Sequence, residues 1–222
     1  MKKSGKTVRF KYISSLILMI FLLAVVTLHA MLLQSLPVYA QAESISDSVL
    51  RLRVIANSNQ KEDQELKLSV KSRLCQSLKP LLDTCASKEE AVARVQENMD
   101  WIQQEADNIL HELTGSSRTK CTVQLTGSLF PIRTYGNLTF PPGCYDTLLV
   151  TLGEGKGENW WCVLYPTLCF TDETTASFSE DAETKLQKSL SEADFSALNE
   201  GVTFQLKIAE VFEDLYYTFF SD

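Results

Sequence analysis

The amino terminus places the strongest constraint on what this chain can fold into. Five basic residues and no acidic residue lie within the first 11 positions, and an apolar run follows from Ile13 to about Leu36. A basic start, an apolar stretch and the small residues Val38 and Ala40 are typical of a secretory signal peptide and its cleavage site. The run is longer than the roughly 7–15 apolar residues of most signal peptides and approaches the roughly 20 that span a bilayer. We therefore expect residues 1–40 to be a signal peptide or an N-terminal membrane anchor.

Both alternatives export the rest of the chain, because the positively charged flank stays inside the cell. We favour cleavage, which would leave Gln41 or Glu43 as the new amino terminus. Without residues 1–40 the chain has 16 basic and 28 acidic residues, a net charge of −12. Such a surface repels phosphate backbones, which argues against nucleic-acid binding. About 180 residues are enough for one domain with a hydrophobic core.

Hydrophobic periodicity predicts that the exported part begins with a strand and two amphipathic helices. Apolar residues alternate from Leu50 to Ala56, with Arg51 and Arg53 on the other face, as in a half-buried strand. Leucine or valine then recurs at every fourth position over residues 66–82, which indicates a helix that opens near residue 59. A second helix is predicted from a capping box at Ser87 to a C-cap at Gly115.

After residue 119 the pattern changes to short strands separated by Gly, Pro or Asn. We expect an antiparallel β-meander, so that the domain, residues 43–170, is α+β. The predicted strands are residues 120–127, 130–140, 145–152 and 159–166. Residues 171–200 are acidic and poor in large apolar residues, which favours a flexible or loosely helical linker. Residues 201–222 carry an apolar stripe and are predicted to form a C-terminal amphipathic helix.

The stretch "GEGKGENWWCVLYPTLCF", residues 153–170, contains the candidate functional residues. Its three glycines and Lys156 resemble a phosphate-binding loop, but such a loop lies between a strand and a helix. Here Glu154 and Glu158 sit within the loop and a strand follows, so a turn is favoured over a phosphate site.

All six cysteines lie in the exported part of the chain, where disulfides can form. Cys162 and Cys169 flank Pro166 and are candidates for a local disulfide. Two buried free thiols and a metal site remain as alternatives. A metal site is the least favoured, because no second close pair of cysteines or histidines accompanies these two.

The two adjacent tryptophans face opposite sides of the predicted strand. Trp160 shares a face with Cys162, and Trp161 shares the other with Tyr165. One face should enter the core, and the other is either covered or left for a partner, where Trp and Tyr are common anchors. We favour Trp161 as the outward residue, because Trp160 shares its face with the candidate disulfide.

The sequence contains few residues that could form a catalytic site. His111 is the one histidine outside the first 40 residues, and its place late in a predicted helix is typical of a solvated surface. A carboxylate pair such as Asp146 and Glu154 would suit a glycosidase, yet two close acids mean little among 28. No catalytic residue, metal or cofactor is therefore expected, although an exported hydrolase stays open as an alternative.

Three strings of this sequence resemble the stage II sporulation protein R family of endospore-forming bacteria. They are "LRLRVIANSN", "DQELKLSVKSRL" and "FPIRTYGNLTFPPGCYDTLLVTLGEGKGENWWCVLYPTLCF", and the similarity covers roughly residues 49–170 and the apolar C-terminal segment. The family carries no established catalytic residues, so the resemblance transfers none. The additional cysteines at 75, 85, 121 and 144 are a departure from the family pattern.

The resemblance implies a signalling protein. Members are made in the forespore and secreted across its membrane into the space between the two septal membranes. There they activate a membrane-embedded aspartic protease of the mother cell, which processes a sigma-factor precursor. The alternative from another class is an exported enzyme that acts on the cell wall or on the protease. As residues that bind the partner we predict Glu154, Lys156, Trp160, Trp161 and Tyr165.

Overall fold

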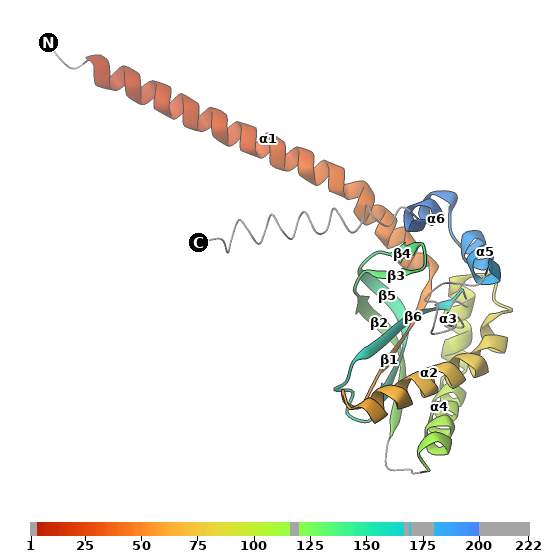
Figure 1. Cartoon of the computed structure of the whole chain (residues 1–222). Coiled ribbons are helices and arrows are strands. Elements are labelled where there is room, and N and C mark those ends of the chain that lie inside the picture. Colours follow the sequence, from red (N-terminus) through yellow and green to blue (C-terminus); the bar gives the residue numbers. More distant parts are fainter. Residues whose placement is uncertain (1–3, 116–119, 167–168, 170–179, 200–222) are drawn as a thin grey trace. The chain divides into compact units, whose positions relative to one another are not determined.

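The computed structural model describes residues 4–115, 120–166, 169 and 180–199. The chain divides into two units, residues 1–41 and residues 42–222. Helix α1 (Ser4–Ser48) makes up the described part of the first unit and ends inside the second (Figure 1). In the second unit, the last turn of α1 is part of the packed domain, because Ile45 and the following Val49 are fully buried.

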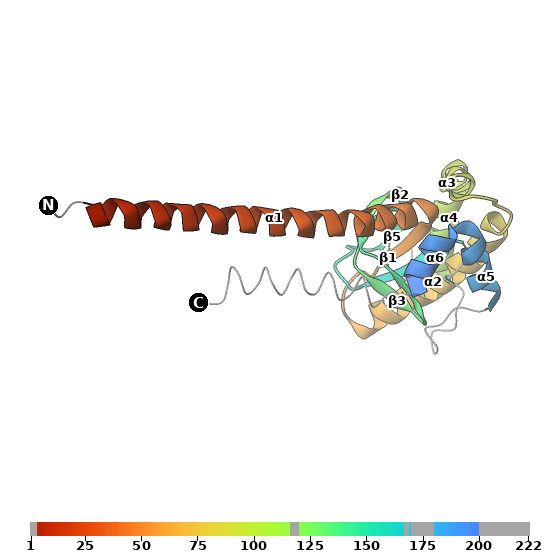
Figure 2. The same ribbon diagram turned by 90° about the horizontal axis from the view of Figure 1, so that it is seen from above.

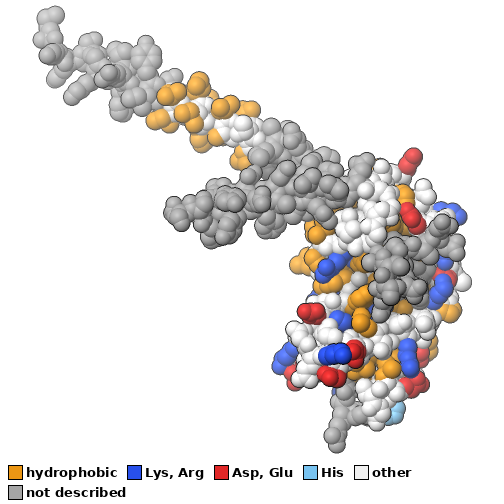
Figure 3. Space-filling model, in the orientation of Figure 1, with side chains coloured by type: hydrophobic (Ala, Val, Ile, Leu, Met, Phe, Trp, Pro, Cys, Tyr) orange, Lys and Arg blue, Asp and Glu red, His pale blue; other side chains and the backbone are white. Residues whose placement is uncertain are grey.

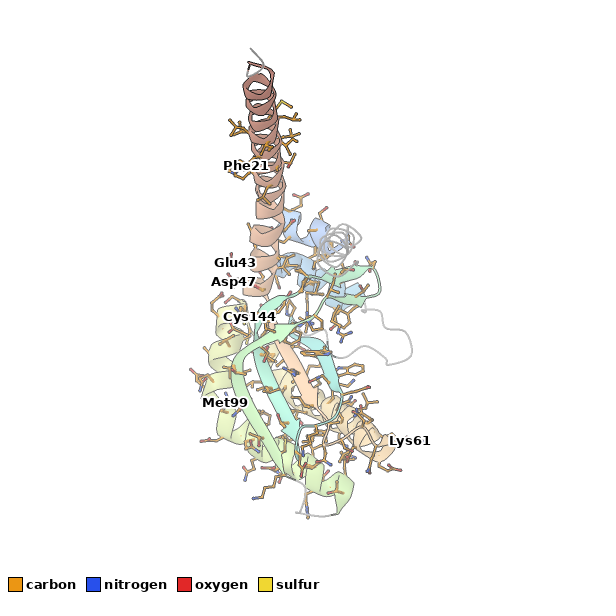
Figure 4. All side chains as sticks on the ribbon, turned by 90° about the vertical axis from the view of Figure 1, so that its left-hand side faces the viewer. Phe21, Glu43, Asp47, Lys61, Met99 and Cys144 are labelled. Atoms are coloured by element: carbon orange, nitrogen blue, oxygen red, sulfur yellow. A yellow bond between two sulfur atoms is a disulfide. The ribbon has the colours of Figure 1, made fainter. Side chains whose placement is uncertain are left out.

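The first unit is a single helix with apolar side chains on its surface. Between Leu16 and Leu28 its large apolar side chains are exposed, which Figure 3 shows as an orange band, and Phe21 projects from the helix in Figure 4. By length, hydropathy and charge, none of the helices among the described residues qualifies as a membrane span. The choice between a signal peptide and an anchor for residues 1–40 stays a prediction.

The two predicted amphipathic helices are present, but the second is divided. Helix α2 (Lys61–Leu82) begins close to the predicted residue 59 and has Glu62 and Asp63 in its first turn. The region predicted as one helix forms α3 (Lys88–Glu97) and α4 (Met99–Thr114). The division falls at Asn98, whose Nδ2 donates to the carbonyl of Arg94 at 2.8 Å, and side chains of this kind compete with helical backbone bonds.

Both predicted ends of the second helical region are confirmed. Ser87 accepts a hydrogen bond from the Glu90 backbone N–H at 3.2 Å, and the Glu90 carboxylate accepts from the Ala86 N–H at 2.9 Å. These bonds close the start of α3 much as a capping box does, except that Glu90 accepts from the residue before the N-cap. Gly115 ends α4 with φ 62°, the left-handed conformation that glycine adopts most easily.

The strands form one four-stranded sheet and one hairpin. The sheet contains β1 (Leu50–Ile55), β2 (Cys121–Phe130), β5 (Gly143–Leu152) and β6 (Asn159–Tyr165) in the order β2-β5-β1-β6. The hairpin pairs β3 (Arg133–Tyr135) with β4 (Leu138–Phe140). The predicted α+β class is confirmed.

The strands differ from the predicted meander in two respects: residues predicted as one strand over 130–140 form the separate β3–β4 hairpin, and β1 enters the main sheet. Strand β1 lies between β5 and β6 and runs parallel to β5, so the loop 153–158 crosses over the end of β1 instead of closing a hairpin. Every residue of β1 is at least half-buried, including the arginines predicted to face solvent. A strand buried on both faces belongs in the centre of a sheet.

The two faces of the sheet are covered differently. Helices α2, α3 and α4 pack on one face, where Leu52, Val54, Leu148 and Val150 meet their apolar stripes (Figures 1 and 2). We call this side the helix face. On the opposite side the β3–β4 hairpin covers the half around Arg51, and no described element covers the rest. The view in Figure 4 looks toward that side, with the strands in front. We call this uncovered half the open face; it consists of Arg53, Ile55, Gln124, Thr126, Leu149, Thr151 and Trp161.

Two helices lie in the stretch predicted as a flexible or loosely helical linker. These are α5 (Glu180–Ser189) and α6 (Glu192–Asn199), and their leucines Leu186 and Leu198 are fully buried. Helix α6 is tied down at both ends, because Asp194 accepts from Ser44 at 2.8 Å and Asn199 accepts from Asn137 at 2.8 Å. Residues 171–179 and the predicted C-terminal helix, residues 201–222, lie outside the described residues.

Candidate functional site

The loop after β5, residues 153–158, is an ordered crossover that depends on the turn after β1. The backbone N–H groups of Lys156 and Gly157 donate to the carbonyls of Asn57 and Ala56 at 3.1 and 2.9 Å. The Asn57 side chain accepts from the Glu154 N–H at 3.0 Å, and the Asn59 side chain accepts from the Glu158 N–H at 2.8 Å. The turn after β1 therefore sets the shape of the glycine-rich loop.

This hydrogen bonding is incompatible with a phosphate cradle. The two remaining N–H groups, of Gly153 and Gly155, donate to the carbonyls of Lys120 and Leu152 at 2.8 and 3.1 Å. Every backbone N–H from Gly153 to Glu158 is thus used within the protein, whereas a phosphate loop directs free N–H groups at its ligand. Glu154 and Lys156 pair at 2.6 Å while 68% and 75% exposed, so their pairing contributes little stability and both side chains stay accessible.

Strand β6 directs its two tryptophans to opposite faces of the sheet. Trp160 lies opposite Val54 and packs against the core on the helix face, where the Lys71 ammonium stands 4.6 Å from its ring centroid. Trp161 lies opposite Arg53 on the open face, and the Arg53 guanidinium lies 4.6 Å from its ring centroid. The alternation therefore places Trp160 on the helix face and Trp161 on the open face, and both side chains are partly buried.

Tyr165 is placed in the core and not on the face of Trp161. The register between β1 and β6 shifts at Leu50 and Arg51, and this irregularity brings Tyr165 opposite Leu50. Its hydroxyl donates to the carbonyl of Cys85 at 3.4 Å, and burial raises its pKa. Period-two alternation cannot anticipate such a shift, because a bulge turns every later side chain to the other face.

Arg51 occupies an aromatic cage next to the open face, which the sequence pattern did not reveal. Its guanidinium lies 4.4, 5.0 and 5.1 Å from the ring centroids of Phe130, Phe140 and Tyr145. The side chain is fully buried, and its Nε and Nη1 have no hydrogen-bond partner among the described residues. The signal in the sequence was the aromatic-rich segment 130–145, whose proximity to Arg51 depends on a strand order that the pattern does not fix.

Tyr135 connects this cage to Trp161. The hydroxyl of Tyr135 accepts a hydrogen bond from Arg51 Nη2 at 3.1 Å and donates one to the backbone carbonyl of Trp161 at 2.9 Å. Phe130 completes the connection, with its ring centroid 4.6 Å from that of Trp161 in an edge-to-face arrangement. Burial lowers the pKa of Arg51 and raises the pKa of Tyr135.

The remaining cation of this region is Arg133, at the start of the hairpin. Its guanidinium lies 5.8 Å from the Trp161 ring, and its side chain is exposed. Arg53 and Arg133 thus flank one tryptophan, the buried Arg51 lies beneath the adjacent hairpin, and among the described residues no carboxylate pairs with any of the three. A basic, aromatic surface of this kind favours an acidic partner with apolar side chains.

The structure joins Cys162 and Cys169 in a disulfide with their Cα atoms 5.6 Å apart. The sequence did not predict their neighbour Cys75, on α2, whose sulfur lies within 4.8 Å of both. Because two of these three sulfurs are bonded to each other, the group offers a metal one free thiol. Burial raises the pKa of that Cys75 thiol to about 12, which keeps it protonated and unreactive.

The structure does not bring together the residues considered for catalysis. Asp146 lies near the start of β5 and pairs with Lys88 at 2.6 Å, whereas Glu154 follows the end of that strand. The strand from Asp146 to Leu152 alone spans roughly 20 Å, too far for the two carboxylates of a glycosidase. His111 lies in the last turn of α4, on the helix side of the sheet.

Comparisons with known proteins agree with one another. The model of a family described as stage II sporulation protein R matches residues 46–175. The chain is also similar to stage II sporulation protein R of Bacillus subtilis (strain 168), with 34% identity over 141 residues. That alignment covers 64% of this chain and 62% of the relative, so the chain spans less than two thirds of the relative's length. No solved structure matches the chain.

Proposed function

Because this chain belongs to the stage II sporulation protein R family and so has a role in sporulation, we propose that it is an exported signal between the two compartments of the sporulating cell. In this proposal it crosses the forespore membrane into the intermembrane space. There it binds a membrane-embedded aspartic protease and activates it, and the protease then processes a mother-cell sigma-factor precursor. The chain acts by binding and carries out no chemistry of its own.

The observation that carries the proposal is the open face around Trp161. Trp161 and Arg53 stand on a sheet that the helices hold rigid from behind, and Arg133 adjoins them. Large aromatic and arginine side chains on a preorganised surface are the residues that most often dominate binding energy at interfaces. Glu154 and Lys156 lie in the loop that connects directly to the same strand, so they belong to the rim of this surface.

Reconstitution tests whether the chain is an activator or an enzyme. The full chain is titrated into vesicles that contain the protease and its precursor substrate, and processing is followed on gels. A binding activator should raise the processing rate until each protease carries one or a fixed number of chains. If far fewer chains than proteases produce the full rate, the chain acts catalytically on the protease and the proposal is wrong.

Tryptophan variants test the surface. Trp161→Ala should weaken activation by roughly 30-fold in the concentration required, the equivalent of about 2 kcal/mol at an interface anchor. Trp101→Ala is the matched control, because Trp101 on α4 is 42% exposed and lies behind the sheet, so activation should not change. Trp160→Ala should instead lower the free energy of unfolding, by about 3–5 kcal/mol if its site does not collapse. Thermal unfolding of each variant separates the two effects, and unchanged activation by Trp161→Ala would place the contact elsewhere.

A further inference from the structure

The open face has the apolar residues of a sheet face that is usually covered by another element. Ile55, Leu149 and Trp161 on it are only half-buried, and the helices that bury the other face have no counterpart here among the described residues. A sheet with apolar residues on both faces packs something against each of them. The open face therefore has the composition of an interface.

The charges near the open face identify what it would accept. Arg53 donates a hydrogen bond to the Asn159 side chain at 2.8 Å, but neither Arg53 nor Arg133 has a carboxylate partner in the described part of the chain. The buried Arg51 adds a third positive charge beneath the hairpin. The exported part of the chain is otherwise strongly acidic. A segment that presents apolar residues together with carboxylates would complement this region in both respects.

The chain itself delivers such a segment to this place. Helix α6 ends at Asn199, whose side chain is hydrogen-bonded at 2.8 Å to Asn137 in the turn of the β3–β4 hairpin. That hairpin lies over the same side of the sheet as the open face. Helix α6 therefore ends beside the hairpin that covers the adjoining half of this side of the sheet.

The sequence of the remaining segment matches the surface. Apolar residues recur at helical spacing from Phe204 to Phe219, and Glu210, Glu213 and Asp214 give the segment a net negative charge. Sixteen residues of helix are roughly 24 Å long. A strand of 10 residues such as β5 is roughly 33 Å long and the hairpin covers about half of it, so the uncovered length accommodates about three turns of helix.

We propose that residues 201–222 dock on the open face, with their apolar stripe on Ile55, Leu149 and Trp161 and their carboxylates toward Arg53 and Arg133. This intramolecular contact does not depend on the proposed function. If both the docking and the proposed function are correct, the segment covers Trp161 in the free protein. The protease can then contact Trp161 only after it displaces the segment.

Photo-crosslinking in the full chain tests the contact. Thr126 is exposed on the open face, so Thr126→p-benzoylphenylalanine should crosslink to a peptide within residues 201–222 after irradiation. The yield should not depend on protein concentration, because both groups belong to one chain. The matched control is Trp101→p-benzoylphenylalanine on α4, which should give no crosslink to this segment.

Charge reversal tests the complementarity. In the Thr126 variant, the combined changes Glu210→Lys, Glu213→Lys and Asp214→Lys should lower the crosslink yield by roughly fivefold or more. Adding Arg53→Glu and Arg133→Glu should restore much of the yield. Circular dichroism establishes that each variant is folded.

Three results would overturn the docking without touching the proposed function. One is the absence of any crosslink from Thr126 to residues 201–222, and another is an equal yield from the control position. The third is a crosslink between two chains whose yield rises with concentration, which would make a second copy the occupant of the open face.

Discussion

At the scale of single residues, Arg51 is a positive charge that folding removes from water at a cost in free energy. It is fully buried, no carboxylate in the described part of the chain pairs with it, and burial lowers its pKa. Removing a charge from water costs several kcal/mol in proteins, whereas a cation beside an aromatic ring gains about 0.5–2 kcal/mol. Arginine suits this cage because its planar guanidinium stacks on rings and is weakly hydrated.

Two substitutions separate the charge of Arg51 from its packing. Arg51→Lys keeps the buried charge but replaces the stacked plane with a strongly hydrated ammonium, whereas Arg51→Met keeps the length and removes the charge. We expect Arg51→Lys to be the less stable variant by about 2 kcal/mol or more, which chemical denaturation measures. Equal stability of the two variants would show that the charge is not truly desolvated.

At the scale of elements, the loop 153–158 and the turn after β1 act as one unit. Gly153 and Gly155 have φ values of 56° and 62°, which side chains other than glycine rarely adopt. A Cβ atom at Gly157 would collide with the carbonyl of Ser58 and lie 2.8 Å from the Cβ of Ala56. The glycines therefore serve a close backbone crossing, not a ligand.

Gly157→Ala should therefore push the loop 153–158 away from the turn after β1. Because the obstacle is backbone, the loop must move, and we expect a loss of about 1–3 kcal/mol in the free energy of unfolding. Gly143→Ala is the matched control, since its Cβ would meet only Tyr145 at an ordinary 3.5 Å, and its effect should stay within about 0.5 kcal/mol. Thermal denaturation of both variants measures the difference. A Gly157→Ala protein as stable as the control would contradict this account of the crossing.

Asp63 should make the same region sensitive to acid. Its carboxylate accepts hydrogen bonds from Ser58 and Asn57 at 2.6 and 2.9 Å, and these bonds lower its pKa. A lowered pKa adds stability above the unfolded value near 3.9, and this is lost as the pH falls through the lower folded value. Asp63→Asn should thus cost about 0.3–1 kcal/mol at about pH 6, and this cost should shrink progressively as the pH falls below about 4. A stability difference that is independent of pH would contradict this role.

Local patterns predicted most elements and only part of the candidate site. The capping box at Ser87 and the C-cap at Gly115 could be predicted, because they depend on neighbours in the sequence. The opposite orientations of Trp160 and Trp161 also follow from period-two alternation. The cage around Arg51, the inward turn of Tyr165 and the proximity of Cys75 to the disulfide depend on strand order and register, which local patterns do not encode.

At the scale of the whole molecule, the boundary between the two units decides what a cleaved protein would contain. The units meet between Gln41 and Ala42, close to the predicted cleavage positions. Ile45 and Val49, just beyond, are buried in the domain. Cleavage should therefore spare the folded core, and mass spectrometry of the exported form should find Gln41 or Glu43 at its amino terminus. An intact Met1 in an exported, membrane-bound product would establish the anchor alternative.

The central place of β1 also governs when this domain can fold. Arg51 pairs with Thr147 and Leu52 with Cys162, so each of these contacts closes a loop of roughly 100 residues. Contacts this distant in sequence slow folding. During synthesis or translocation across a membrane, β1 emerges before its two partner strands. Both of its edges stay unpaired until β5 and β6 have also emerged. In that interval the chain can collapse prematurely or aggregate through the unpaired edges of β1, and this risk ends only when β6 is available to pair.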